Sequence, residues 1–337
     1  MRKSVLILLS ALIIFSCSED KNKEGLSKTP EKKLDKGPVK LINYSFEKGE
    51  QIDYKLNTKV TSSQTIESDT SFTSSSTQDV TYTFGLEILK VDDNNIADIE
   101  ITVNKILASA EIDGDKVEYD SKYIYSSRER MVFADYESIK GKTFSVRITA
   151  TGEVLEIYDV SEIVDELISI KSKGQKITSV QRKQFEESFK EQGLTPLVQQ
   201  LFKTLTNEKV GVESQWSHKY PSTLGSFQIE NIATFQVKEF YTANNDSLAR
   251  LNAHLAVRWF GQNQVQEQGV NYTFSDPNIS GFGTIDFNLT EGWVDKSEST
   301  VRMEMDVTMD SFDANKKPVR AVKKDFIESK NILTRLK

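Results

Sequence analysis

Few side chains in this sequence of 337 residues have the chemistry that catalysis or metal binding needs. It contains two histidines, His218 and His254, and a single cysteine, Cys17. A serine nucleophile would need one of these histidines as its base, and a lone cysteine excludes both a disulfide framework and a cysteine-rich metal site. None of the HExxH, GxSxG, GxGxxG or P-loop patterns occurs. We therefore expect no catalytic residue, no metal ligand and no cofactor, and a protein that is not an enzyme.

The acidic residues leave one enzymatic alternative open. Any two of the 50 could converge in the fold as the carboxylate pair of a hydrolase, although no spacing nominates a pair. Calcium needs six to eight oxygen ligands, and neither Asp113-Gly-Asp115 nor residues 306–313 spell the twelve-residue calcium loop.

Two aromatic clusters are the candidates for ligand contact. Their members are Tyr119, Tyr123 and Tyr125 in the first, and Trp216, His218 and Tyr220 in the second. In a strand the members of each cluster share one face, because side chains alternate between the two faces. Such rings can lie against a sugar or an apolar ligand. The alternative, which the sequence favours, is core packing, because aromatic residues are common strand formers.

The composition is that of a globular protein, with 37% hydrophobic, 28% charged and 9% aromatic residues. The length suffices for roughly two domains of about 150 residues each. The formal net charge is −7, which excludes the diffuse basic field that binds phosphate backbones. We therefore expect no nucleic-acid partner.

The N-terminus has the pattern of a signal peptide. Arg2 and Lys3 precede eleven residues, 5–15, that contain no charge. As a helix they would rise only about 16 Å, too little for the roughly 30 Å hydrocarbon core of a bilayer. The segment therefore indicates an h-region that ends at Ser16, immediately before Cys17.

The residues Ile14-Phe-Ser-Cys17 resemble a bacterial lipobox, although Phe15 is bulkier than the usual occupant of its position. The resemblance implies a signal peptide over residues 1–16, cleavage between Ser16 and Cys17, and a diacylglycerol on the Cys17 thiol. Two or more acyl chains give a durable membrane anchor. The alternative is an ordinary signal peptide with a coincidental cysteine.

Residues 17–40 are expected to form an acylated flexible linker, because they are rich in lysine and acidic residues and show no apolar periodicity. The acidic residues just after Cys17 resemble the surface-export signal of Bacteroidota lipoproteins. We expect an outer-membrane lipoprotein of the cell envelope, and the export signal favours the cell surface over the periplasmic face.

Two β-rich halves, residues 41–159 and 207–337, are predicted from alternating apolar and polar residues. Residues 301–309 are the clearest case, with five apolar side chains on one face and polar side chains on the other. Strands with one wet face indicate antiparallel sheet, and turn sequences such as 92–95 and 244–246 separate them. The Ser/Thr-rich residues 60–80 indicate a long exposed hairpin.

The two halves also resemble each other internally. Residues 83–99 echo residues 234–251, and matching residues precede and follow them in the same order. This pattern predicts two similar curved antiparallel sheets produced by duplication. The alternative is that β-meanders share the same turn residues.

Between the halves, residues 160–206 are predicted to be helical. Residues 161–172 have an amphipathic stripe, a second helix spans about 178–192 and stops at Gly193, and Thr195 caps a third helix with Pro196 at its first position. The apolar stripes need a partner, so we expect them to cover the concave face of one or both sheets. The predicted fold class is mainly β (α+β).

The sequence resembles an uncharacterised family of Bacteroidota lipoproteins and secreted proteins, known mainly as a domain of unknown function. The segments that carry the resemblance are 46–54, 119–121, 141–144 with 151–154, and 210–216. It implies an envelope location and a β-rich fold, and it supplies no catalytic residues.

The function we expect is non-enzymatic binding of an apolar ligand or a partner segment by a membrane-anchored protein. A structural or assembly subunit of an envelope complex is the second hypothesis, and a hydrolase with an unrecognised site is the third. A cavity of a few hundred cubic ångströms would favour the first hypothesis, and a solid core with an exposed apolar patch the second.

Overall fold

The computed structural model describes residues 38–172, 177–224, 227–260, 262–267, 269–312 and 317–337. The expected signal peptide, Cys17 and most of the expected linker lie outside these residues. Every helix and strand named below lies within residues 51–336. In this part of the chain, no helix is both long enough and apolar enough to cross a membrane.

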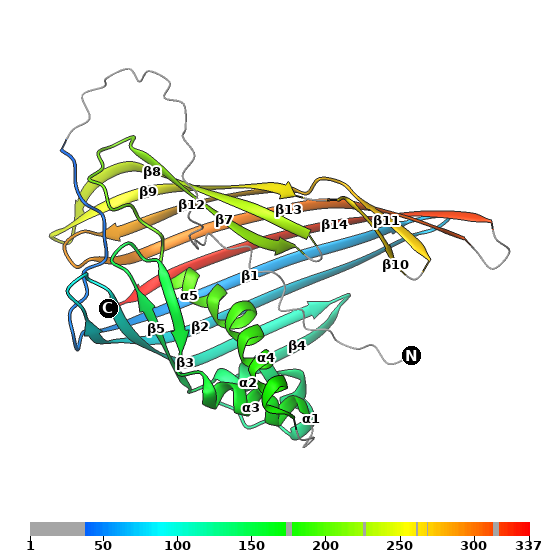
Figure 1. Cartoon of the computed structure of the whole chain (residues 1–337), viewed down its shortest axis with the longest axis horizontal. Coiled ribbons are helices and arrows are strands. Elements are labelled where there is room, and N and C mark those ends of the chain that lie inside the picture. The colour runs from blue at the N-terminus through cyan, green and yellow to red at the C-terminus, as the bar shows by residue number, and fades with distance from the viewer. Residues whose placement is uncertain (1–37, 173–176, 225–226, 261, 268, 313–316) are drawn as a thin grey trace.

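The strands form one antiparallel sheet, and they run along the long axis of the molecule (Figure 1). The strands are β1 (Gln51–Glu67), β2 (Ser71–Val91), β3 (Ala97–Ile112), β4 (Asp115–Asp120), β5 (Thr143–Ile148), β6 (Val154–Tyr158), β7 (Gln215–Leu224), β8 (Phe227–Ala243), β9 (Asp246–Phe260), β10 (Gln264–Glu267), β11 (Val270–Phe274), β12 (Asn278–Asn288), β13 (Trp293–Phe312) and β14 (Pro318–Leu336). Their order is β6-β5-β3-β2-β1-β14-β13-β12-β9-β8-β7, with β4, β10 and β11 off this path. The mainly β, antiparallel prediction is confirmed.

The two β-rich halves meet in this one sheet, because β1 pairs with β14 from Asp53↔Leu336 to Glu67↔Val322. The sequence predicted two sheets, whereas the structure has one. The physical reason is that two separate sheets would leave two more long edges with unpaired backbone groups, and the β1–β14 pairing removes them. The chain outside the strands also joins the halves, since Lys40 forms a β-bridge with Val210.

The predicted hairpins are present. The 92–95 turn connects β2 to β3, the 244–246 turn connects β8 to β9, and residues 60–80 form most of the β1–β2 hairpin. Asn244 and Asn245 have φ values of 51° and 71°, which asparagine adopts more readily than other side chains and which a tight hairpin turn requires.

The helices are α1 (Ser127–Val132), α2 (Ala134–Ile139), α3 (Ser161–Ser172), α4 (Ser179–Phe189) and α5 (Thr195–Leu201), and a π-helical segment, Lys190–Leu194, joins α4 to α5. The prediction of α3 is confirmed at both ends. The predicted stop at Gly193 is wrong, because the π-helical segment continues the chain into α5. Thr195 is not an N-cap: it is the first residue of α5, and its hydroxyl donates to the Lys190 carbonyl at 2.8 Å. The sequence did not predict α1 and α2.

The α5 segment, residues 195–205, covers one end of the concave face of the sheet. It contacts β6 at one edge and also β1 and β14, although three strands separate β6 from β1 in the sheet, so the sheet curves around it. Leu197, Val198 and Leu201 of α5 are buried, and the Phe202 ring packs edge-on against Tyr44. By contrast, no residue of α4 is buried, and α3 packs mainly against α1, α2 and α4. Of the three predicted helices, α5 is therefore the one that covers the sheet, and the expectation is wrong for the other two.

Candidate binding trough on the concave face

The first predicted aromatic cluster is a packing cluster. Tyr119 is 3% exposed, its ring stacks on Tyr125 with centroids 5.1 Å apart, and its hydroxyl donates to the buried Glu137 carboxylate at 2.9 Å. Burial, together with this carboxylate, raises the pKa of Tyr119. The prediction that the three tyrosines share one strand face is wrong, because β4 ends at Asp120 and Tyr123 is 56% exposed on the following turn. Tyr119 and Tyr125 pack against Phe133, and Tyr119 also packs against Tyr136, so these rings fasten α2 and the residue that precedes it to β4.

The second predicted cluster does share one face of its strand. Trp216, His218 and Tyr220 alternate along β7, opposite Phe235, Ala233 and Asn231 of β8. The Trp216 ring stacks on Phe235 at 5.6 Å, and burial lowers the pKa of His218. The indole Nε1 of Trp216 and the Nε2 of His218 have no hydrogen-bond partner among the described residues. Trp216 and His218 line a hollow of about 370 Å³ between β7 and the β5–β6 turn, so these two residues remain candidate ligand contacts at the sheet edge. Tyr220 is buried and does not line this hollow.

A larger candidate lies where the concave face continues beyond α5. In β1 the inward-facing residues Tyr54, Leu56 and Thr58 are buried, whereas those further toward the hairpin end, Val60, Ser62 and Gln64, are only partly buried. A cavity of about 460 Å³ opens here, lined by β1, β2, β3, β13 and β14. We call this cavity the trough.

The lining of the trough is polar along its middle and apolar along both sides. The polar side chains come mainly from β1 and β2 and are Ser62, Gln64, Ser74, Ser76 and Gln78. The apolar side chains are Val60 of β1, Ala110 and Ile112 of β3, Met303 of β13 and Ile327 of β14, and β3 and β13 lie on opposite sides of the β1–β2 pair. The polar strip is internally hydrogen-bonded, since the hydroxyl groups of Ser62 and Ser76 lie 2.8 Å apart. A ligand that fits both kinds of surface is amphipathic.

One apolar residue of the lining, Met303, belongs to the stripe that the sequence predicted over residues 301–309. Alternate residues of β13, beginning with the buried Val301 and Met303 and including Met305, Val307 and Met309, occupy one face of the strand. By its register with Ile327 of β14, Met303 faces the trough. Methionine is unbranched and polarizable, so the Met303 side chain can adapt to ligands of different shape.

The described residues that line the trough include two charged side chains, and these neutralise each other. The Lys323 Nζ lies 2.9 Å from an Asp325 carboxylate oxygen, and the Gln64 amide donates to the other Asp325 oxygen at 3.1 Å. The lining therefore offers neither a free cation for an anionic ligand nor a second carboxylate for acid–base catalysis.

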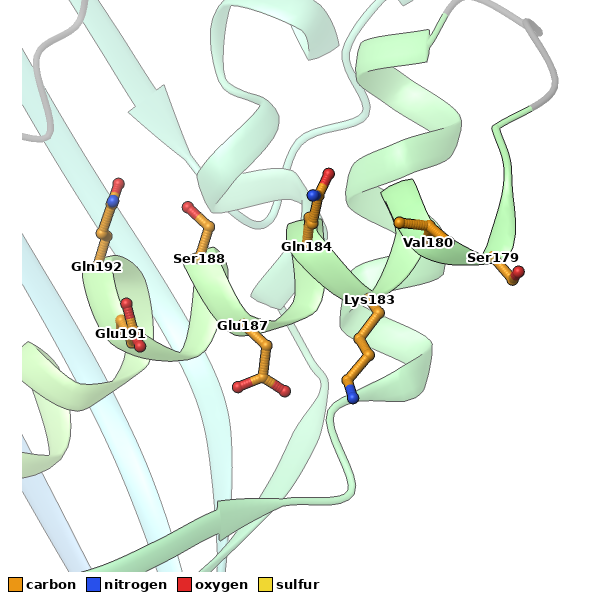
Figure 2. Close-up of a pocket in the computed structure, with 8 residues that line it drawn as sticks. All are labelled: Ser179, Val180, Lys183, Gln184, Glu187, Ser188, Glu191 and Gln192. Atoms are coloured by element: carbon orange, nitrogen blue, oxygen red, sulfur yellow. The ribbon is translucent and has the colours of Figure 1, made fainter.

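A hollow of about 640 Å³ lies along α4, but it has the properties of a helix surface. Its lining residues all belong to α4 or to the π-helical segment, and Figure 2 shows that Lys183 and Glu187 extend from one side of the helix. Since no residue of α4 is buried and no second element faces the hollow among the described residues, we do not treat it as a binding site.

Sequence reasoning identified the strands of the trough but missed the cavity. The Ser/Thr-rich residues 60–80 were interpreted only as an exposed hairpin. Their alternation placed Ser62, Gln64 and Ser76 on the same face as the core residues of β1 and β2, which was the available signal. The β1–β14 pairing that brings Met303 and Ile327 alongside them has no local sequence signal.

Comparisons with known proteins give a family and no activity. A family model described as "Family of unknown function (DUF6263)" matches residues 94–294. No curated protein matches the sequence.

Two solved structures show only distant likeness. One is titled "Lipid-protein interactions in lipovitellin" and has 11% identity and a TM-score of 0.41 over 87% of this chain, which spans about a quarter (26%) of that chain. The other, a crystal structure of Pseudomonas aeruginosa OccK11 (OpdR), has 7% identity and a TM-score of 0.15, with 87% of this chain and 100% of that chain covered. At these TM-scores neither likeness carries a functional argument.

Proposed function

The chain belongs to the DUF6263 family of unknown function, and we propose from its geometry that it is a non-enzymatic binding protein that holds an amphipathic or apolar ligand in the trough. The observation that carries the proposal is the partial filling of the concave face. The α5 segment covers one end of that face, and the same face continues as an open cavity of about 460 Å³ at the other end.

The size of the trough suits a single acyl chain. At about 30 Å³ per group of the size of a water molecule, its volume holds about 15 heavy atoms. Burying about 12 methylenes would contribute roughly 10 kcal/mol, and association costs about 4 kcal/mol or more. The remaining roughly 6 kcal/mol corresponds to a dissociation constant of tens of micromolar. That affinity suits a protein that both takes up and releases its ligand.

We also propose that the protein is lipid-anchored through Cys17 in the cell envelope, with the outer membrane, and its surface in particular, as the site. The lipobox-like residues 14–17 and the charged segment that follows support this location. The anchor would hold the trough close to the bilayer, so the protein could take up membrane lipids directly. The described fold begins at residue 38, so about 20 residues would separate it from the anchor.

A second candidate function is that of an assembly subunit in an envelope complex. Phe72, Phe260 and Phe312, near the ends of long strands, are at least half exposed, and Phe312 is 71% exposed. A contiguous exposed apolar patch marks an interaction site, and these three rings are the candidates for one. A hydrolase has less support, because the lining of the trough supplies a single carboxylate, that of Asp325, which is already paired.

The internal duplication stays a proposal. Its support is that the strands of the two halves follow one another outward from the central β1–β14 pair, apart from the short strands off this path. The β2–β3 and β8–β9 hairpins, which contain the two matching segments, each have a register shift near the turn.

Extraction of bound molecules tests the proposed binding function. The chain from Ser18 onward, which contains every described element, would be purified without detergent and examined by native mass spectrometry and by lipid analysis of an organic extract. We expect a copurified amphipathic molecule at up to one per chain. A chain of the bare polypeptide mass that also fails to take up added lipid would contradict the proposal.

A further inference from the structure

The trough ends inward at two buried polar side chains of β14 that have unused hydrogen-bonding groups. Ser329 is 3% exposed and Asn331 is 2% exposed. The Ser329 Oγ and the Asn331 Nδ2 find no hydrogen-bond partner within the described part of the chain. Thr58 donates to the Asn331 Oδ1 at 2.9 Å, so one end of the amide is satisfied and the other is not. An unsatisfied buried polar group is destabilising, so these positions call for a partner.

The register places Ser329 directly beside the lining of the trough and Asn331 one pair further inward. Ser329 pairs with Val60 of β1, which lines the trough, and Asn331 pairs with Thr58. Side chains directly opposite each other on paired strands have Cβ atoms about 5 Å apart. Ile327, which precedes Ser329 on the same face of β14, lines the trough as well. A rotation about χ1 of Ser329 can therefore direct its hydroxyl toward a ligand beside Val60, and the Asn331 amide is the next polar group on the same face.

The charge of the site restricts what that ligand can be. Lys323, the cation of the trough lining, is held by Asp325 at 2.9 Å and lies six residues along β14 from Ser329. A carboxylate or phosphate at Ser329 would be buried without a countercharge, which is strongly unfavourable. A hydroxyl group can both donate and accept, so it can pair with a serine hydroxyl and an amide N–H together.

We propose that the ligand of the trough is an uncharged lipid with a hydroxyl-bearing head group, such as an acylglycerol or an alkyl glycoside. Its head group sits against Ser329 and Asn331, and its chain runs outward along Met303 and Ile327. This inference rests on the proposed binding function and specifies its substrate class. The polar row that includes Ser62 and Ser76 gives a larger head group further hydroxyl partners.

Two lipids with the same acyl chain test the inference. Dissociation constants of 1-monolauroylglycerol and of laurate would be measured by titration calorimetry at pH 8, below their micelle concentrations, on the chain from Ser18 onward. We expect the glyceride to bind at least about tenfold more tightly, since an unpaired buried charge costs more than the 1.4 kcal/mol that this ratio represents. Asn331→Leu should weaken glyceride binding by about fivefold, the value of one neutral hydrogen bond, and leave laurate unchanged.

The control is Asn278→Leu, which makes the same substitution on an exposed residue of β12 and should alter neither constant. If Asn331→Leu fails to fold, Ser329→Ala provides the same comparison with a smaller change. Equal affinities for the two lipids would overturn the head-group assignment and leave the trough as an apolar site. So would a glyceride dissociation constant that neither Asn331→Leu nor Ser329→Ala changes. Binding of neither lipid would instead contradict the proposed function.

Discussion

The packing of residues 202–205, which follow α5, against the segment that precedes β1 can be tested by removing a single oxygen atom. The backbone N–H of Lys203 donates to the Tyr44 hydroxyl at 2.7 Å, and both residues are buried. The Tyr44 ring also packs against Phe202, Phe287 and Trp293, with centroids 5.4–5.7 Å from Tyr44 for each of these rings. Tyr44→Phe keeps these ring contacts and removes only the acceptor.

The expected cost follows from what the change leaves behind. The Lys203 N–H becomes a buried donor without a partner, which costs about 1–3 kcal/mol. The free energy of unfolding would be measured by urea denaturation of the wild type, of Tyr44→Phe and of the control Tyr123→Phe. Tyr123 is mostly exposed, so its hydroxyl should contribute within about 0.5 kcal/mol. An unchanged stability for Tyr44→Phe would refute the docking of residues 202–205 against the sheet.

Three further predictions concern the same region and its surroundings. Burial lowers the pKa of Lys203 to about 7 from the usual 10.5, so between these pH values the unfolded chain binds more protons than the folded chain. Lys203 therefore destabilises the fold most below pH 7, and this penalty declines as the pH rises toward 10.5. Between pH 7 and 9, the free energy of unfolding measured with urea should rise by about 2 kcal/mol more for the wild type than for Lys203→Met, and an equal pH dependence of the two proteins would contradict the burial. Gly152 has a φ of 81°, and a Cβ there would lie 2.3 Å from the Lys203 carbonyl oxygen. Gly114 has a similar φ of 90°, but there is open space around it. Gly152→Ala should therefore lower the melting temperature more than Gly114→Ala does. Leu167→Asp buries a charge in the small apolar cluster formed by α2 and α3, so amide hydrogen exchange should accelerate in these two helices while β13 stays protected. Unchanged protection of α2 and α3 would mean that Leu167 is not buried between them.

The local elements of this fold could be predicted because their signals are local. The alternation over 301–309, the asparagine-rich turn at 244–246 and the amphipathic stripe of 161–172 each fall within one element. Each of these signals corresponds to an element in the structure.

The errors arose where contacts outside the segment decide the structure. Thr195-Pro196 has the sequence of a helix start, but the Thr195 hydroxyl bonds to Lys190 one turn earlier, within a continuous helical run. Tyr123 has the spacing of a strand residue relative to Tyr119, but β4 ends between them at Asp120.

The candidate site was the least predictable part. Its lining comes from residues 60–78, 110–112 and 303–327, and the pairing of β1 with β14 depends on register over about 270 residues of sequence separation. No local pattern encodes such pairing, because it is selected by the free energy of the whole sheet. The sequence did indicate the apolar face that carries Met303, without indicating that part of this face stays uncovered.

Filling the trough tests the central claim most directly. Ser62→Trp places a large ring in the trough, whereas Thr61→Trp places the same ring on the exposed opposite face of the same strand. Both variants and the wild type would be titrated with a fluorescent acyl-chain probe whose emission rises in an apolar environment. We expect saturable binding to the wild type and to Thr61→Trp, and loss of at least tenfold in affinity for Ser62→Trp. Equal binding by all three proteins would place the ligand elsewhere and contradict the account.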